Sequence, residues 1–150
     1  MPDSPISLAR GAPGLDLIPA TELAECARAA ALREGARVFA YGSGAGYAPL
    51  REWVAERNGV EPDCVVLTVG GLLGFVLYAQ EQLARQPGRV LVEGPTYDRP
   101  LKILTRLGAE IVTVPMDDEG LIPDELPEGD FAFLYTIPTF QNPSGRTMSV

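Results

Sequence analysis

The sequence contains no histidine and only two cysteines. Neither Cys26 nor Cys64 lies in a Cys-x-x-Cys or Cys/His pattern of the kind that holds a metal. Without histidine, the chain also lacks the general base of Ser-His and Cys-His catalytic triads. We therefore expect neither a metal site nor a triad-dependent hydrolase.

Clustered positive charge and long apolar runs are also missing. The 12 Lys and Arg residues are scattered among 20 Asp and Glu residues, and the formal net charge is −8. This charge repels phosphate backbones, so we expect no nucleic-acid partner. No apolar run approaches the roughly 20 residues that cross a bilayer, and residues 1–10 lack the basic-then-apolar order of a signal peptide. The sequence predicts a soluble, cytoplasmic protein with no membrane partner.

What the sequence does contain is material for one domain-sized core, since 46% of its 150 residues are hydrophobic. Residues 6–19 are rich in glycine and proline, which predicts an extended arm. Thr21 is a candidate N-cap for a first helix that ends at Gly35. A second helix is expected from Pro49 to Gly59, where glycine favours a left-handed stop.

Four short apolar runs follow, and apolar residues at helical spacing separate the first three. The runs are Val65–Val69, Arg89–Glu93, Glu110–Val114 and Phe131–Tyr135. Continuous runs of this kind are typical of strands in a parallel sheet that is covered on both faces. The predicted fold is therefore an α/β sheet, with a ligand site beyond the carboxyl ends of its strands.

Three segments at those carboxyl ends carry residues that suit a ligand. Gly70-Gly71 leads directly into a helix whose free N–H groups could bind a phosphate, although a glycine pair is more often a tight turn. Tyr97, which follows the rigid Pro95, could present a flat aromatic face or simply cover the edge of the core. Asn142 lies in a loop stiffened by proline and glycine, where ordinary Asn-Pro turn chemistry is the alternative.

Two further patterns are similar to functional motifs but have simpler explanations. Gly42-Ser-Gly-Ala-Gly46 is similar to a dinucleotide-binding loop, yet Tyr47 stands where the last glycine is required, so we expect a flexible turn. The acidic cluster Asp117-Asp118-Glu119 could indicate metal binding or acid-base chemistry. Because it lies in a polar stretch that ends in Gly120, it is expected to be a solvated turn.

Taken together, Thr68-Val-Gly-Gly71, Glu93-Gly-Pro-Thr-Tyr97 and Gln141-Asn-Pro-Ser-Gly145 resemble the class I/II aminotransferases of PLP fold type I. The resemblance extends upstream to Tyr41–Arg51 and to the Gly11-Ala-Pro13 arm, and its nearest branch includes the α-aminoadipate and kynurenine aminotransferases. It implies that residues 1–46 form an N-terminal arm and helix. Residues 47–150 would then be part of the PLP-binding large domain, with its C-terminal remainder absent.

The resemblance implies a role for individual residues in binding pyridoxal 5'-phosphate (PLP). Gly71 and Leu72 would offer backbone N–H groups to the phosphate. Tyr97 would stack on the pyridine ring, and the amide of Asn142 would donate a hydrogen bond to its phenolate oxygen. Tyr41 matches a tyrosine that reaches across a dimer interface to the phosphate of the neighbouring subunit.

Some positions depart from the family pattern. Where many relatives have polar side chains after the first glycine, this chain has Leu72-Leu73, so phosphate binding would depend more on backbone groups. Gly11 matches the arm that closes over the substrate and is the candidate substrate-binding residue. Arg10 precedes it in place of a more usual small or apolar residue, and its role is left open.

The largest departure concerns the Schiff-base lysine, which in this family follows the Asn-Pro-Gly segment. The aspartate that pairs with the ring nitrogen and the arginines that bind the phosphate and the substrate carboxylate also follow that segment in the family. Lys102 is the only lysine here, and it is flanked by Leu101 and Ile103 on a predicted helix, where a surface position is expected. We therefore assign no catalytic residue and expect the chain alone to be inactive.

By resemblance, the expected function is the transfer of an amino group between an amino acid and a 2-oxo acid through PLP, in a protein that is a homodimer at full length. Two alternatives stay open. One is a ligand-sensing domain of a transcription regulator, against which we note that no basic helix-turn-helix precedes Ile6. The other is a non-catalytic fragment, which would expose a sheet edge and apolar surface and would therefore be poorly soluble or associated.

Overall fold

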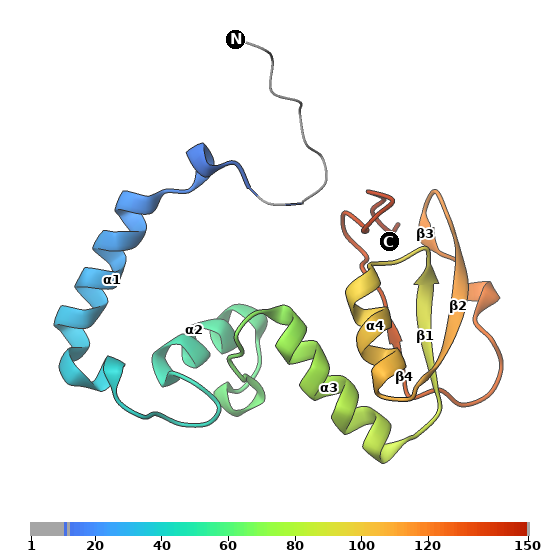
Figure 1. Cartoon of the computed structure of the whole chain (residues 1–150), viewed down its shortest axis with the longest axis horizontal. Helices are drawn as coiled ribbons and strands as arrows, with labels where there is room; N and C mark the ends of the chain where they lie inside the picture. Colours follow the sequence, from blue (N-terminus) through green and yellow to red (C-terminus); the bar gives the residue numbers. More distant parts are fainter. Residues whose placement is uncertain (1–10, 12, 150) are drawn as a thin grey trace, which may run out of the picture. The chain divides into compact units, whose positions relative to one another are not determined.

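The computed structural model describes residue 11 and residues 13–149 of the chain (Figure 1). These residues fall into two compact units, Met1–Gly44 and Ala45–Val150, and each unit is described by itself. Among the described residues, no helix combines the length and the apolar character needed to cross a bilayer.

The first unit consists of short helical elements without a buried core. Its elements are η1 (Leu15–Leu17), α1 (Ala20–Glu34) and η2 (Gly35–Phe39), and none of their residues is buried. The helix α1 starts two residues earlier than expected, because Leu23 N already donates to Pro19 O at 3.0 Å. Thr21 therefore lies inside the first turn and is not the N-cap, which is Pro19. The end of the helix is as predicted, with Gly35 at a φ of 61°.

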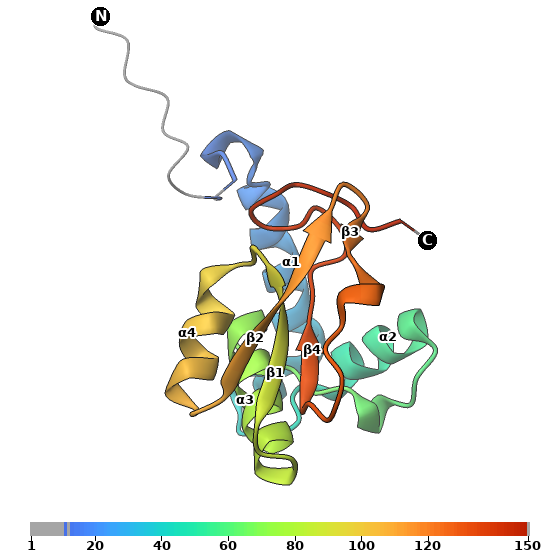
Figure 2. The same ribbon diagram turned by 90° about the vertical axis from the view of Figure 1, so that its right-hand side faces the viewer.

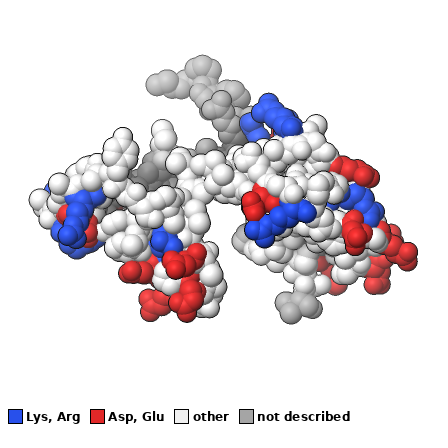
Figure 3. Space-filling view, turned by 90° about the horizontal axis from the view of Figure 1, so that it is seen from below, with Lys and Arg blue, Asp and Glu red and all other residues white. Residues whose placement is uncertain are grey.

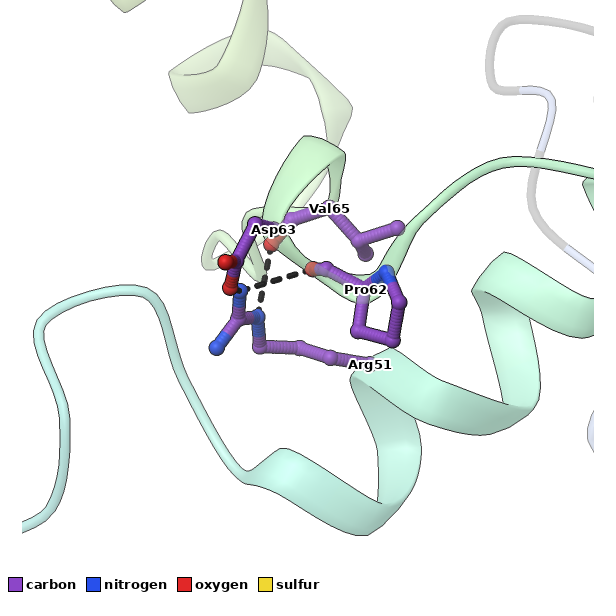
Figure 4. Close-up of polar contacts among 4 residues, drawn as sticks. All are labelled: Arg51, Pro62, Asp63 and Val65. Atoms are coloured by element: carbon purple, nitrogen blue, oxygen red, sulfur yellow. Dashed lines mark hydrogen bonds and ion pairs between the residues drawn. The ribbon is translucent and has the colours of Figure 1, made fainter.

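The second unit opens with α2 (Ala48–Asn58), which ends at Gly59 in the left-handed conformation as predicted. Arg51 on this helix reaches the short η3 (Pro62–Cys64) and the residue after it. Its guanidinium donates to Pro62 O at 2.7 Å and to Val65 O at 2.8 Å, and it forms an ion pair with Asp63 at 3.2 Å (Figure 4). Arg51 thus holds the segment that leads toward the next helix.

The prediction of a strand at Val65–Val69 is wrong. The segment is extended at Val65, but it joins no sheet, and its one backbone hydrogen bond to a distant residue runs from Leu67 N to Ala45 O at 2.9 Å. A strand requires a neighbouring strand that completes its hydrogen-bond ladder. Val65 is buried, but Val66 and Val69 are 58% and 92% exposed, so burial within the described structure accounts for only part of this apolar run.

The sheet has four strands in the order β3-β2-β1-β4, and Figure 2 shows the longer strands side by side. Its strands are β1 (Arg89–Gly94), β2 (Glu110–Asp117), β3 (Gly120–Leu121) and β4 (Phe133–Tyr135), and the elements between and before them are α3 (Gly71–Arg85), α4 (Asp98–Arg106) and η4 (Pro123–Glu125). The strand β1 pairs in parallel with β2 and with β4, whereas β3 returns antiparallel to β2. The predicted α/β fold with a mainly parallel sheet is therefore confirmed.

The strand boundaries differ from the prediction at two places. The strand β2 extends to Asp117, because its last residues pair with β3 in a tight hairpin. Asp118 and Glu119 form the exposed turn of this hairpin, as expected for a solvated turn, whereas Asp117 is the last residue of β2. The strand β4 begins at Phe133 rather than at Phe131, because only residues 133–135 pair with β1.

Both α3 and α4 pack on one face of the sheet. That face carries a core of Ala79, Val90, Val92, Leu104 and Phe133, to which the two helices contribute further apolar residues. The opposite face has a smaller cluster of Leu91, Val114 and Leu121, against which Met148 packs. Helices therefore cover one face of the sheet, and residues around Met148 lie against the other.

Candidate functional site

The first predicted site segment is the start of α3. Gly70 is its N-cap with φ 83° and ψ 158°, a conformation that is accessible to glycine and strained for other residues. The first N–H groups of a helix have no partner within the helix, and at α3 they belong to Gly71 and the leucines after it. No heavy atom lies within 4 Å of the position that a Cβ on Gly71 would take, so the approach to these groups is open.

One turn into α3, an aromatic contact connects the helix start to the carboxyl end of β4. The ring centroids of Phe75 and Tyr135 lie 5.2 Å apart in an edge-to-face arrangement. Burial raises the pKa of Tyr135 above its usual 10.0, and the negative charge of Glu93 and the nearby Tyr97 raise the pKa further. The phenol of Tyr135 is thus close enough to Glu93, near the end of β1, and to Tyr97, at the start of α4, to respond to their charges.

The second predicted segment follows β1, where Tyr97 is the N-cap residue of α4 and is half-buried. Gly94 has no room for a side chain, since a Cβ there would lie 2.2 Å from Cγ2 of Thr113 on β2. The peptide bond from Gly94 to Pro95 is cis. This loop therefore leaves the sheet close to the neighbouring strand and brings Tyr97 to the start of α4.

The third predicted segment, which follows β4, carries Asn142. Its side chain is exposed and has no hydrogen-bond partner among the described residues. The preceding residue, Gln141, is 2% exposed, and its amide donates to Pro95 O at 2.7 Å. Because Pro95 lies two residues before Tyr97, this bond joins the loops of Tyr97 and Asn142.

The sequence prediction missed a buried polar pair beneath these loops. Glu93 is 1% exposed and accepts a hydrogen bond from the Gln141 amide at 3.0 Å and another from Ile137 N at 2.9 Å. The Thr136 hydroxyl also donates to this carboxylate. The sequence feature that could have indicated this pair is a glutamate directly after the apolar residues of β1. Its partners in the loop after β4 lie 43 to 48 residues further along the chain.

The structure brings some predicted site residues together and leaves others apart. The loops of Tyr97 and Asn142 are joined by a hydrogen bond, and the helix start at Gly71 is connected to them through Phe75 and Tyr135. Gly11 and Tyr41 are both exposed and belong to the unit of residues 1–44, which is described separately. Arg10 lies outside the described residues.

Lys102 lies on the surface of α4, as the sequence predicts. Its side chain is 65% exposed and forms an ion pair with Asp98 one turn earlier. The hydrogen bond from Lys102 lowers the pKa of Asp98 below its usual 3.8. A protonated lysine in a surface ion pair is a poor nucleophile, so the position does not suit Schiff-base chemistry.

The surface charges are mixed in sign. Figure 3 shows basic side chains next to acidic ones on the face that it presents, in keeping with pairs such as Arg85–Glu81 and Arg146–Asp118. No group of three or more potential metal-ligating side chains comes together in the described part of the chain. The groups at the carboxyl ends of β1 and β4 include the carboxylate of Glu93, the ring of Tyr135 and the amide of Gln141.

Comparison with known proteins identifies relatives along nearly the whole chain, although no family model matches it. A 2-aminoadipate transaminase of Thermus thermophilus is 37% identical over 144 residues, which cover 93% of this chain and 36% of that protein. An uncharacterized HTH-type transcriptional regulator of Bacillus subtilis, YisV, is 30% identical over 96% of this chain and 31% of its own length. The chain thus spans about a third of the length of the curated relatives that it matches.

Solved structures of aminotransferases also match this chain over nearly its whole length. The α-aminoadipate aminotransferase LysN of Thermus thermophilus, complexed with N-(5'-phosphopyridoxyl)-L-leucine, superposes with a TM-score of 0.81 at 35% identity, covering 94% of this chain and 37% of that one. A kynurenine aminotransferase of Pyrococcus horikoshii gives a TM-score of 0.74 at 27% identity, covering 95% and 39%.

Proposed function

We propose that this chain, which is related by sequence and by fold to the class I/II aminotransferases of PLP fold type I, forms part of an enzyme that moves an amino group between an amino acid and a 2-oxo acid. The observation that carries the proposal is the junction at the carboxyl end of the sheet. There the hydrogen bond from Gln141 to Pro95 and the contact of Phe75 with Tyr135 connect three segments that suit one cofactor.

The donor groups of these segments fit pyridoxal 5'-phosphate. The open N–H groups at the start of a 15-residue helix suit a phosphate dianion, since the helix dipole adds to their hydrogen bonds. A half-buried tyrosine suits a flat heterocycle, and an exposed amide without a protein partner suits an anionic ring oxygen. When bound, this cofactor supplies an electron sink for the bonds at the amino acid Cα.

Each residue then has a role in orienting the cofactor. The N–H groups of Gly71 and Leu72 would bind the phosphate without help from the leucine side chain, so this site would depend on backbone donors. Tyr97 would lie against the ring and keep water from it. Asn142 would donate its amide hydrogen to the ring oxygen and so help to orient the ring.

Two roles belong to the unit of residues 1–44. Tyr41, which is 109% exposed, suits a residue that contacts another subunit, and we assign it to the phosphate of the partner in a homodimer. Gly11 belongs to an arm that closes over the substrate, a position in which the absence of a side chain allows close approach. Both assignments rest on the family resemblance.

The proposed activity requires a lysine nucleophile that this chain does not supply. Lys102 is held in its ion pair with Asp98, so the chain by itself binds the cofactor without catalysing transfer. We place the protein in the cytoplasm and assign no nucleic-acid or membrane partner to this part of it.

A second candidate function is ligand sensing in a transcription regulator, which the similarity to the Bacillus subtilis regulator favours. The same loops would then bind PLP or a related molecule as a signal. The two candidates share the cofactor site and differ in whether amino transfer follows.

The phosphate assignment can be tested with pyridoxine 5'-phosphate, which lacks the aldehyde and therefore binds without reacting with a lysine. In Gly71→Pro, proline at the first helical position keeps the helix but removes one N–H donor. We expect its affinity to fall about tenfold or more, since a hydrogen bond to a charged group contributes roughly 1.5 to 3 kcal/mol. Fluorescence titration of the 150-residue chain measures the effect.

Gly71→Ala is the matched control for this experiment. The Cβ meets no atom within 4 Å, and the backbone of Gly71 is helical, so the variant keeps both its fold and its N–H group. Equal affinities for the alanine and proline variants would show that the phosphate is bound elsewhere.

A further inference from the structure

A buried carboxylate without a cation lies beneath the proposed cofactor site. Glu93, the residue before the last one of β1, is 1% exposed, and none of the described Lys or Arg side chains forms an ion pair with it. Burial of a charge is costly unless several hydrogen bonds replace the lost water. A residue that serves only as core filling at this position would be apolar, as its neighbours on β1 are.

The hydrogen bonds of this carboxylate come from different segments. One oxygen accepts from the Thr136 hydroxyl and from Ile137 N at 2.9 Å, both directly after β4. The other oxygen accepts from Gln141 Nε2 at 3.0 Å and, at 3.5 Å, from the Thr96 hydroxyl next to Tyr97. Glu93 therefore connects the end of its own strand to the loop after β1 and to the loop after β4.

The partners of Gln141 determine which way its amide points. Its nitrogen lies 2.7 Å from the carbonyl oxygen of Pro95, which can only accept, and its oxygen accepts from Ser144 N at 2.9 Å. A carboxylate at this position would place an oxygen against the Pro95 carbonyl, and an apolar side chain would leave all these groups unpaired. An amide is therefore the group that satisfies both sides.

The backbone of Gln141 closes the loop that carries Asn142. Gln141 N donates to Arg146 O at 2.8 Å, and Gln141 O accepts from Gly145 N. Through its side chain, the same residue holds Pro95, two positions before Tyr97. The two loops are thus fixed to one another at a single buried residue, while Asn142 stays exposed on the outer side.

We infer that Glu93 and Gln141 form a positioning pair that fixes the Tyr97 loop and the Asn142 loop relative to one another. Directional hydrogen bonds specify an orientation that apolar packing does not, which is the advantage that offsets the cost of burying the charge. The role of the pair in orienting a cofactor rests on the proposed function. The coupling between the loops follows from the contacts themselves.

Exchanging the two residues tests the pair. In Glu93→Gln, one of the two acceptor positions becomes a donor. It faces Gln141 Nε2 or, with the amide turned over, Ile137 N, so in either orientation two donors oppose each other and a connection to the loop after β4 breaks. In the exchanged variant Glu93→Gln/Gln141→Glu, the amide at 93 donates to the carboxylate at 141, and Ser144 N keeps its acceptor. The contact with the Pro95 carbonyl is not restored, because two acceptors now face each other.

The measurement is the backbone order parameter of Tyr97 and Asn142 from ¹⁵N relaxation of the 150-residue chain. We expect both values to fall from about 0.85, typical of rigid backbone, to below about 0.6 in Glu93→Gln. In the exchanged variant, Asn142 returns to the rigid value and Tyr97 does not. A purely structural role would not produce this one-sided rescue. Glu110→Gln, an exposed strand glutamate on β2, is the control and leaves both values unchanged.

Several results would overturn the inference. If Glu93→Gln leaves the order parameters of Tyr97 and Asn142 unchanged, the loops are not coupled through the pair. If Glu93→Gln unfolds, circular dichroism of the exchanged variant tests the pairing instead. An exchanged variant that is also unfolded contradicts the pairing. Adding pyridoxine 5'-phosphate separates the positioning pair from the proposed function. If the loops are coupled but their resonances do not respond to the ligand, the inference about the pair holds and the proposed function is wrong.

Discussion

At the scale of single residues, Tyr135 has the most perturbed environment of the candidate site. Its ring packs against Phe75, and its hydroxyl experiences burial together with the charges of Glu93 and Tyr97. All three influences disfavour the phenolate, so they raise the pKa of Tyr135 above 10.0. The ionisation of this residue therefore reports on the integrity of the site.

The raised pKa gives a prediction for alkaline pH. In the unfolded chain this tyrosine ionises near pH 10, whereas in the folded chain it keeps its proton to a higher pH. The folded state then binds more protons above pH 10, so the free energy of unfolding falls as the pH rises through that window. Tyr135→Phe should make the free energy of unfolding depend less on pH there, as measured by urea unfolding at a series of pH values.

Tyr41→Phe is the control for this prediction, since Tyr41 is fully exposed. It should leave the alkaline slope of the unfolding free energy unchanged. An identical slope for the Tyr135→Phe variant and the unsubstituted chain would mean that Tyr135 ionises as an ordinary surface tyrosine.

The sequence predicts individual residues well where the chemistry is local. Gly71 and Tyr97 each lie next to the helix start or strand end that gives them a role, so a short motif identifies them. Glu93 and Gln141 escaped prediction because their roles depend on partners brought together by the sheet, 48 residues apart in sequence. A buried glutamate and a surface glutamate look alike until the fold is known.

At the scale of secondary-structure elements, the connection from α2 to α3 depends on Arg51. Its planar guanidinium binds the carbonyl oxygens of Pro62 and Val65 from a side chain that is 12% exposed. Pro62 O also accepts a hydrogen bond from Val65 N at 3.1 Å, and the segment runs on to the Gly70-Gly71 turn. Arg51 therefore stabilises the approach to the helix start.

Replacing Arg51 should destabilise the fold, because its side chain is largely buried. We expect Arg51→Ala to lower the free energy of unfolding by about 2 to 3 kcal/mol, because two charge-assisted hydrogen bonds are lost. Arg51→Lys should recover only part of this loss, since a single ammonium cannot reproduce the planar fork. Urea unfolding midpoints measure both variants.

The control is Arg106→Ala, at the exposed end of α4, which we expect to change the free energy of unfolding by no more than about 0.5 kcal/mol. Equal losses for Arg51→Ala and Arg106→Ala would contradict the role of Arg51 in holding the η3 segment.

Element prediction succeeded where pattern and burial coincide. The strand β1 and the helix α3 combine an apolar pattern with buried residues, and α2 ends at the predicted stop signal, Gly59. The run Val65–Val69 has the composition of a strand but no partner strand among the described residues. The strand β3 has two residues, too few for any periodic pattern.

At the scale of the whole molecule, the chain matches about a third of the length of its relatives, and its described helices cover one face of the sheet. On α3, Leu77 and Tyr78 are each 50% exposed. Such apolar surface favours association, so poor solubility or self-association of the isolated chain stays a prediction. The cofactor site does not depend on self-association, because its three segments all lie within residues 45–150.

The central claim is that the start of α3, the ring of Tyr97 and the amide of Asn142 contact one phosphorylated heterocycle. Chemical-shift mapping of the ¹⁵N-labelled 150-residue chain during titration with pyridoxine 5'-phosphate tests it most directly, with inorganic phosphate as the reference ligand. We expect the resonances of Gly71, Tyr97 and Asn142 to shift along one binding curve, and phosphate alone to shift only Gly71 and its neighbours. Three unrelated binding curves, or no response at Tyr97 and Asn142, would contradict the account.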